Sequence, residues 1–165
     1  MQHDPTVYSN ADEMPNLTPR QQDRVRSWLR LQELVSDGRF GAEMDALFDP
    51  AMTYGNPNRP NIGSYAEWKT SPMEMYDRFQ PCRYRTVYAT GNGDDEIWVH
   101  SRHIGRQVGR YMGIEPGGQE ISVGWFSIVN FRGPLISRIF SIADVLGMLI
   151  SVGAIARDTL ADPFK

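Results

Sequence analysis

The alternation of apolar and polar positions divides the chain into a helical first half and a strand-rich second half. Apolar residues recur at helical spacing over residues 18–36. Thr18 and Gln21 form the capping-box pattern at its start, and Gly38 follows its end. The pattern predicts a helix over 18–36, preceded by a flexible N-terminal arm over residues 1–17.

Shorter elements follow before the middle of the chain. We expect a short helix over 41–48 and a short strand over 51–54. Two further capping boxes begin at Ser64 and Ser71, each with a glutamate three residues later. Together they predict a broken helix that ends near Phe79.

The second half of the chain is rich in Val, Ile, Tyr, Trp and Phe and is divided by glycine-rich turns, which is typical of hairpins. Helices followed by an antiparallel meander make an α+β fold. We expect a strongly bent antiparallel sheet over residues 83–144, with the first helix covering its pocket side. Its strands are predicted over 83–90, 96–109, 120–132 and 135–144.

Composition narrows the class of protein. The chain of 165 residues suits one domain, over residues 18–165, and its 41% hydrophobic and 22% charged residues are typical of globular proteins. A net charge of -3 disfavours nucleic-acid binding. No apolar stretch is long enough to cross a bilayer. The single cysteine, Cys82, excludes an intrachain disulfide and suits the cytoplasm, and we interpret it as a packing residue.

The two histidines in the strand-rich half do not form a metal pair. His100 and His103 are three residues apart, and residues at that spacing point to opposite faces of a strand. The chain has no zinc-ligand spacing and no phosphate-binding loop, so we expect neither metal nor nucleotide. His103 remains a candidate general base or substrate donor, against the alternative of a structural histidine.

Asp144 is the most informative single residue. It is the only acidic residue between Glu120 and Asp158, and its neighbours are apolar. Desolvation by such neighbours raises the pKa of a carboxyl group toward the range useful for proton transfer. The alternative is a helix N-cap, whose backbone hydrogen bonds lower the pKa. The residues alone leave both interpretations open.

Other polar and aromatic residues have similar alternatives. Arg138, Phe140 and Asp144 share one face of a regular strand. On a concave face, Arg138 would contact Asp144 or a substrate oxygen; on the other face it would be solvent-exposed. Trp68 and Trp125 line either a core or a pocket.

Two segments resemble a known family. Residues 109–118, GRYMGIEPGG, are similar to the hairpin G-E-F-M-G-I-P-P-T-G of the SnoaL-like polyketide cyclases. Residues 136–153 resemble the closing motif I-x-E-x-W-x-x-x-D-x-x-G-L-L-x-Q-L-G of the same family. These cyclases belong to the NTF2-like superfamily, and the likeness in element order extends over residues 20–155.

The resemblance implies a cone-shaped NTF2-like fold, in which a curved antiparallel sheet and the N-terminal helices enclose a cofactor-free pocket. It also implies a homodimer. In the family the motif aspartate, which corresponds to Asp144, is the acid/base for an intramolecular aldol ring closure. The candidate substrate-contacting residues are Tyr54, Trp68, Gln107, Trp125, Arg138 and Phe140.

The chain departs from the family pattern at four of these positions. Phe140 stands where the family usually has Trp, and Arg138 where it often has Glu. Gln107 replaces a His before the hairpin, and Tyr54 begins the segment that corresponds to His-Asn-Pro. These losses put the cyclase reaction itself in question and leave chemistry by a lone aspartate open.

The sequence therefore predicts a cofactor-independent acid/base enzyme that acts on a small apolar, polyketide-like carbonyl compound. Intramolecular aldol cyclisation is the leading reaction. The alternatives are a dehydratase, an isomerase, an epoxide hydrolase that uses Asp144 with Arg138, and a non-catalytic small-molecule-binding module.

Overall fold

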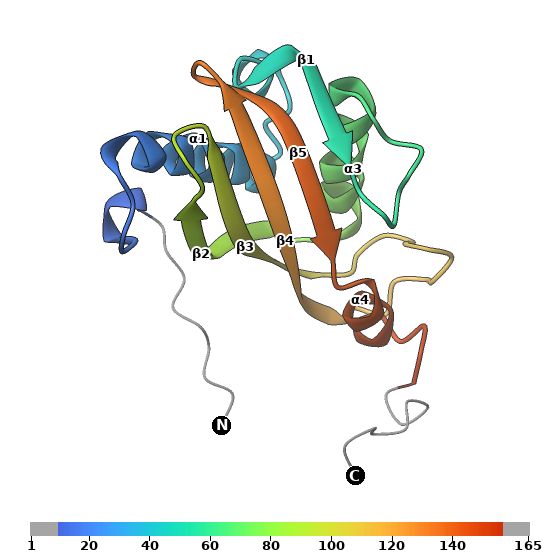
Figure 1. Cartoon of the computed structure of the whole chain (residues 1–165). Helices are drawn as coiled ribbons and strands as arrows, with labels where there is room; N and C mark the ends of the chain where they lie inside the picture. The colour runs from blue at the N-terminus through green and yellow to red at the C-terminus, as the bar shows by residue number, and fades with distance from the viewer. Residues whose placement is uncertain (1–9, 157–165) are drawn as a thin grey trace.

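The computed structural model describes residues 10–156 as one curved sheet with helices on its concave side (Figure 1). The helices are η1 (Ala11–Glu13), α1 (Pro19–Ser36), α2 (Ala42–Asp45), α3 (Tyr65–Arg78) and α4 (Val145–Ser151). The strands are β1 (Phe48–Gly55), β2 (Arg83–Gly91), β3 (Glu96–Arg106), β4 (Glu120–Arg132) and β5 (Leu135–Ala143).

The sheet has the strand order β1-β5-β4-β3-β2. Strands β2 to β5 pair antiparallel, which confirms the meander predicted for residues 83–144. The sheet as a whole is mixed, because β1 pairs parallel with β5. Register shifts in the β2–β3 and β4–β5 pairs mark irregularities of the kind that increase twist and bend a sheet.

Helix α1 covers the concave face, as its apolar periodicity predicted, and its predicted capping box is present. The Thr18 amide donates to Gln21 Oε1 at 2.9 Å, and the Gln21 amide donates to Thr18 Oγ1 at 3.3 Å. The helix packs mainly on β2, while α3 packs on β1. Both helices lie behind the sheet in Figure 1, so the opposite, convex face carries no helix among the described elements.

The segment before α1 is ordered where the structure describes it. Residues 1–9 of the predicted arm lie outside the described residues. Residues 11–13 form η1, which packs against α1, and Ala11 and Met14 are buried. The chain from residue 10 to 17 is therefore part of the packed structure.

The predicted helix over 41–48 and strand over 51–54 have different bounds in the structure. Helix α2 is one turn long, and β1 already begins at Phe48. Phe48 and Met52 are both buried, and this burial accounts for a strand that begins at Phe48 rather than at residue 51. Pro50 is tolerated in β1 because β1 is an edge strand.

Helix α3 is continuous, although the sequence predicted a break. Its first capping box, at Ser64, is present. The second, at Ser71, is not, because the Ser71 hydroxyl accepts a hydrogen bond from Arg59 at 2.7 Å. Pro72 lies inside the helix and is buried beside Trp68.

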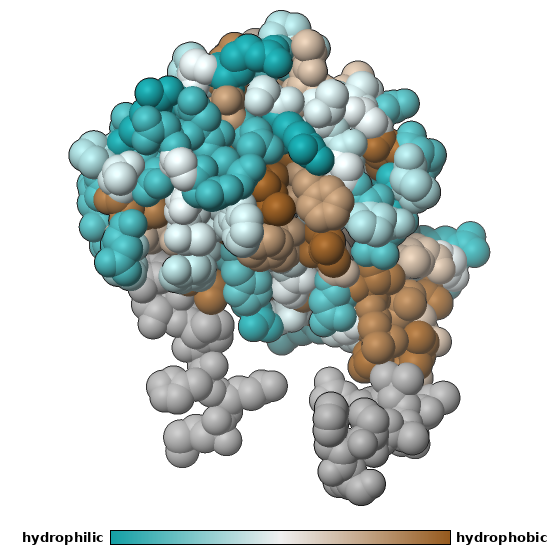
Figure 2. Space-filling model, in the orientation of Figure 1, coloured by the Kyte–Doolittle hydropathy of each residue, from teal (hydrophilic) through white to brown (hydrophobic). Residues whose placement is uncertain are grey.

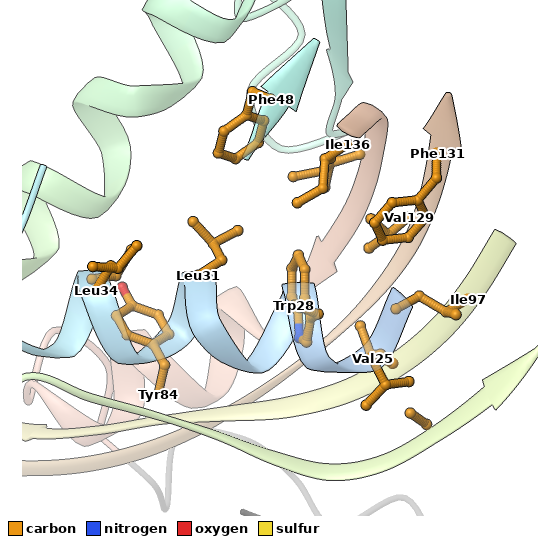
Figure 3. Packing of buried hydrophobic residues seen from close by; sticks show 14 of the residues in the cluster. Val25, Trp28, Leu31, Leu34, Phe48, Tyr84, Ile97, Val129, Phe131 and Ile136 are labelled. Atoms are coloured by element: carbon orange, nitrogen blue, oxygen red, sulfur yellow. The ribbon is translucent and has the colours of Figure 1, made fainter. Parts of the chain in front are cut away.

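The apolar core consists of two clusters. In the main cluster, side chains of α1 such as Val25 and Trp28 face Ile97, Val129 and Ile136 of the sheet (Figure 3). The second cluster is smaller, and it joins α4 to the far ends of β4 and α3. Its buried members are Phe79, Ile121, Val123, Met148 and Val152.

None of the described helices is long and apolar enough to cross a membrane.

Candidate active site

A cavity between the concave face and the helices consists of two adjoining chambers that share the side chains of Tyr84 and Trp125. The first, the Trp28 chamber, has a volume of about 160 Å³ and is lined by α1, α3 and β5. The second, the Asp144 chamber, has a volume of about 230 Å³ and lies toward α4 and the 107–119 segment. Most of the lining of both chambers is apolar, as in small-molecule sites generally.

The Trp28 chamber contains three of the predicted substrate-contacting residues. Tyr54 and Trp68 line this chamber, and Trp125 lines both chambers. The Tyr54 hydroxyl accepts a hydrogen bond from Asn56 at 2.9 Å. The buried Gln32 amide spans the gap between α1 and the sheet: it donates to Ser101 at 2.8 Å and accepts from Thr86 at 2.9 Å.

Asp144 lies at the wall of the Asp144 chamber, directly after the last residue of β5. Its Oδ1 accepts a hydrogen bond from the Gly147 amide at 2.7 Å and caps α4. The N-cap interpretation is therefore correct in geometry. Asp144 is also the only carboxylate among the described residues that line either chamber.

The expected desolvation of Asp144 by its neighbours is not observed, because Asp144 is exposed. Ile142 and Leu146 are themselves 48% and 47% exposed and line neither chamber. Only Ala143 and Val145 of the adjoining residues line the chamber with it.

Gly147 leaves room for the Asp144 carboxylate. A Cβ atom at residue 147 would lie 2.2 Å from Asp144 Oδ2 and 3.0 Å from Oδ1. Its backbone does not require glycine, since its φ is not in the left-handed region. The glycine of the D-x-x-G segment is therefore required by the carboxylate rather than by the helix.

His103 points to the concave face and lines the Asp144 chamber, while His100 points to the convex face. The predicted separation of the two histidines is therefore correct. His103 is only 1% exposed, and burial lowers its pKa to about 4. The neutral imidazole fits a hydrogen-bonding role at neutral pH better than a role as a general base.

Arg138 and Phe140 lie on the convex face and line neither chamber. Phe140 packs over Gly55 of β1, and Arg138 is exposed in register with Asn130. Alternation correctly placed the two side chains on one face. It fails at Asp144, because the strand ends at Ala143 and the backbone turns toward the chamber.

Gln107 also lies outside both chambers. Its side chain is buried and donates to the carbonyl oxygens of Gly109 and Ile114, at 3.2 and 3.1 Å. Gln107 therefore ties the 107–119 segment together, and it is not positioned to contact a substrate.

Several polar residues that the sequence did not single out as site residues line the cavity, among them Tyr84, Arg59, Asn56 and Tyr111. Tyr84 lies on the buried face of β2, where its alternation was a usable signal. Arg59, Asn56 and Tyr111 come from loops and turns, whose path no periodicity predicts. Arg59 is held by Ser71 and lies 3.5 Å from the Glu74 carboxylate.

Over residues 10–156, no group of three or more histidine, cysteine or acidic side chains is arranged to hold a metal ion. The described residues that line the cavity offer one carboxylate, several hydrogen-bond donors and an apolar wall.

Neither a protein-family model nor a curated protein sequence matches the chain. Solved structures do match. TsrD from Streptomyces laurentii has a TM-score of 0.71 at 19% identity, over 85% of this chain and 100% of that one. A protein from Jannaschia sp. CCS1, provisionally named a SnoaL-like polyketide cyclase, has a TM-score of 0.70 at 16% identity, over 85% and 98%. The fold is that of the SnoaL-like polyketide cyclases.

A third match is IdmH from Streptomyces antibioticus, provisionally named a polyketide cyclase, with a TM-score of 0.69 at 17% identity over 78% and 97% of the two chains. The SnoaL-like fold accounts for the positions of both sequence motifs. The 109–118 segment contributes Tyr111 and Met112 to the Asp144 chamber, and the 136–153 segment supplies β5, Asp144 and α4.

Proposed function

We propose that the protein is a cofactor-independent acid/base enzyme that closes a ring in a small apolar carbonyl compound by an intramolecular aldol reaction. The observation that carries this proposal is the placement of Asp144 as the one carboxylate on the wall of a largely apolar cavity, within the residues that the structure describes.

Asp144 would transfer the proton in both directions. Its carboxylate removes a proton alpha to a carbonyl group, so that the C–H electron pair moves into an enolate. The enolate carbon then attacks a second carbonyl carbon of the same molecule, and the proton passes from Asp144 to the new alkoxide. The reaction is redox-neutral, and one positioned acid/base contributes roughly 10²–10⁴-fold to its rate.

The helix cap supports this role of Asp144. Oδ1 is held by the Gly147 amide, whereas Oδ2 has no hydrogen-bond partner among residues 10–156. A carboxylate fixed at one oxygen presents the other in a defined orientation, which favours proton transfer at a fixed carbon. The interpretation of Asp144 as a helix N-cap and its interpretation as the catalytic acid/base are therefore compatible.

The structure weakens one alternative reaction. Epoxide hydrolysis by the expected pair of Asp144 and Arg138 would need the two side chains side by side, and Arg138 lies on the opposite face of the sheet. Arg59 lines the chamber with Asp144, so hydrolysis that uses Arg59 stays an outcome of the test. A dehydratase or an isomerase needs the same proton transfers as the cyclase, so these reactions remain outcomes of the test, as does a binding module without catalysis.

The test follows a phenyl-substituted 1,5-diketone, which is apolar and closes to a six-membered ring. Proton NMR in D₂O reports both exchange of its alpha protons and ring closure. We expect the wild-type protein to accelerate both and Asp144→Asn to reduce both by roughly 10²–10⁴-fold, since a general acid/base contributes that factor. Asn caps helices as well as Asp, so the fold should persist.

Asp77→Asn is the matched control, because Asp77 is an exposed aspartate of α3 that lines neither chamber. It should leave both rates unchanged. Wild-type rates in Asp144→Asn would remove Asp144 from the mechanism. Exchange without ring closure would favour an isomerase or a dehydratase.

A further inference from the structure

The imidazole of His103 is held in one orientation by aromatic neighbours. It stacks on Tyr84, with ring centroids 4.7 Å apart and an interplanar angle of 12°. The Phe79 ring meets it edge-on, with centroids 5.4 Å apart. With 1% of its surface exposed, His103 has little freedom to rotate.

Cys82 contacts one of the two ring nitrogens of His103. Its Sγ lies 3.3 Å from His103 Nε2, and both residues are buried. Burial raises the pKa of the Cys82 thiol to about 12, so the sulfur keeps its hydrogen at neutral pH. Sulfur is only a weak hydrogen-bond acceptor, whereas a neutral ring nitrogen is a good one, so the contact favours the thiol as the donor.

The thiol hydrogen is therefore directed to Nε2, which accepts it. A neutral imidazole that accepts at one nitrogen carries its own hydrogen at the other. In His103 that other nitrogen is Nδ1, which is buried and has no hydrogen-bond partner among the described residues. An unpartnered buried donor is unfavourable, and a substrate oxygen that displaces the chamber lining next to Nδ1 would supply the missing acceptor.

We propose that His103 donates a hydrogen bond from Nδ1 to the substrate's carbonyl oxygen, and that Cys82 is the positioning residue that fixes this tautomer. The proposal rests on the proposed function of the Asp144 chamber. When Asp144 takes the alpha proton, negative charge develops on the carbonyl oxygen, and the Nδ1–H group stabilises it. His103 exchanges no proton in the reaction; Asp144 carries the proton throughout.

The groups around His103 favour a neutral donor. The titratable side chains that face its surroundings are Cys82, just before β2, and Tyr84 of β2, together with Tyr111 of the 107–119 segment and Arg59 and Asp144 across the chamber. Burial raises the pKa of Tyr84 and of Tyr111, so both stay neutral at physiological pH. No carboxylate is within ion-pairing distance of His103 over residues 10–156.

Nitrogen-15 NMR of the histidine side chains tests the tautomer without any substrate. In the wild-type protein, His103 should show one neutral tautomer with hydrogen on Nδ1 between pH 5.5 and 8. Cys82→Ser retains a donor and should keep this tautomer, whereas Cys82→Ala should give a mixture. His100→Gln identifies the His100 signals and should leave His103 unchanged, because His100 lies on the convex face.

The role of His103 as a donor is tested with 4-nitrophenolate, an aromatic anion whose phenolate oxygen mimics the enolate oxygen. Its binding should shift the Nδ1–H resonance of His103, in the wild-type protein and in Asp144→Asn alike. With the diketone, His103→Phe should lower kcat by roughly 10²–10³-fold, the usual loss for one oxyanion donor. Cys82→Ala should lower kcat by a smaller factor than His103→Phe does and leave KM unchanged. Cys82→Ser should have the kcat of the wild-type protein.

Hydrogen on Nε2 in the wild-type protein, or an unchanged tautomer in Cys82→Ala, would overturn the role of Cys82. An unshifted Nδ1–H resonance with 4-nitrophenolate bound would overturn the role of His103 as donor. These outcomes differ from failure of the proposed function, which is decided by the diketone rates in Asp144→Asn.

Discussion

At the scale of single residues, the cavity combines one exposed carboxylate with one buried neutral imidazole. Asp144 is held by a backbone amide and stays accessible, whereas His103 is enclosed by Tyr84, Phe79 and Cys82. The two residues that the sequence offered as catalytic therefore lie on one chamber in very different environments. Such a difference supports the proposal that the first transfers protons and the second donates a hydrogen bond.

The burial of His103 predicts a dependence of stability on pH. Its pKa is about 4 in the folded chain, against 6.5 for the free group, so the unfolded chain binds a proton first as the pH falls. The free energy of unfolding should therefore decrease from pH 6.5 to pH 4 by ~3 kcal/mol from this residue, and not change from this cause above pH 6.5.

Urea unfolding of His103→Gln and His100→Gln across this range measures the effect. For each variant, the free energy of unfolding is plotted against pH. The carboxyl groups titrate in both variants, so the difference between the two slopes isolates the contribution of His103. Equal slopes in the two variants would contradict the prediction.

At the scale of elements, the sequence was a good guide wherever one face of an element is buried. The periodicity of α1 and the alternation of β2 to β5 correctly predicted which elements form and how the strands pair. It did not predict the start of β1, which depends on burial of Phe48, or the continuity of α3 through Pro72. Both are set by tertiary packing, which local patterns do not contain.

The same reason explains the errors at the site. Arg138 and Phe140 were expected at the cavity because they precede Asp144 at even spacing, but the residue that ends a strand no longer follows its alternation. The face that a strand turns to the helices depends on the whole sheet. Asn56 and Arg59 were missed because loops have no periodicity.

Gly147→Ala tests the link between α4 and the carboxylate. Alanine is a better helix former than glycine by about 1 kcal/mol, so propensity alone should stabilise α4. Its Cβ would lie 2.2 Å from Asp144 Oδ2, so the carboxylate must turn away. We expect diketone turnover to fall at least tenfold, with circular dichroism and the bulk fold unchanged.

Gly63→Ala is the control for this substitution, because a Cβ at residue 63 meets no atom within 4 Å. Full activity in Gly147→Ala would show that the position of the carboxylate does not matter for turnover.

At the scale of the whole molecule, the convex face of the sheet carries an apolar patch and is uncovered by any described element. Figure 2 shows apolar side chains gathered over β4 and β5. Three exposed apolar or aromatic side chains of the convex face lie in register across the strands: Tyr88 of β2, Phe126 of β4 and Ile142 of β5, which are 49%, 37% and 48% exposed. Exposed apolar patches of this kind mark interaction surfaces.

The homodimer expected from the sequence stays a prediction, and this face is the surface that we propose for it. Along β3, Glu96 lies at one end of the patch and Arg102 at the other. A two-fold axis through the patch would place Glu96 of one copy opposite Arg102 of its partner, which makes the surface complementary to itself.

Sedimentation equilibrium should give a dimer for the wild-type protein and a monomer for Phe126→Ser. Val108→Ser is the control, because Val108 is 48% exposed but lies outside the sheet. A wild-type monomer at micromolar concentration would contradict the prediction.

If Asp144 carries turnover as proposed, the division of the core into two clusters makes activity and folding separable events. The main cluster joins α1 to the sheet, whereas α4, which fixes Asp144, depends on the smaller cluster around Phe79 and Met148. Small peripheral units open locally at a lower free-energy cost than the whole domain. Each opening of α4 would release the Gly147 amide from Asp144 and suspend turnover while the sheet stays intact, so the fraction of active molecules is governed by seven residues of helix.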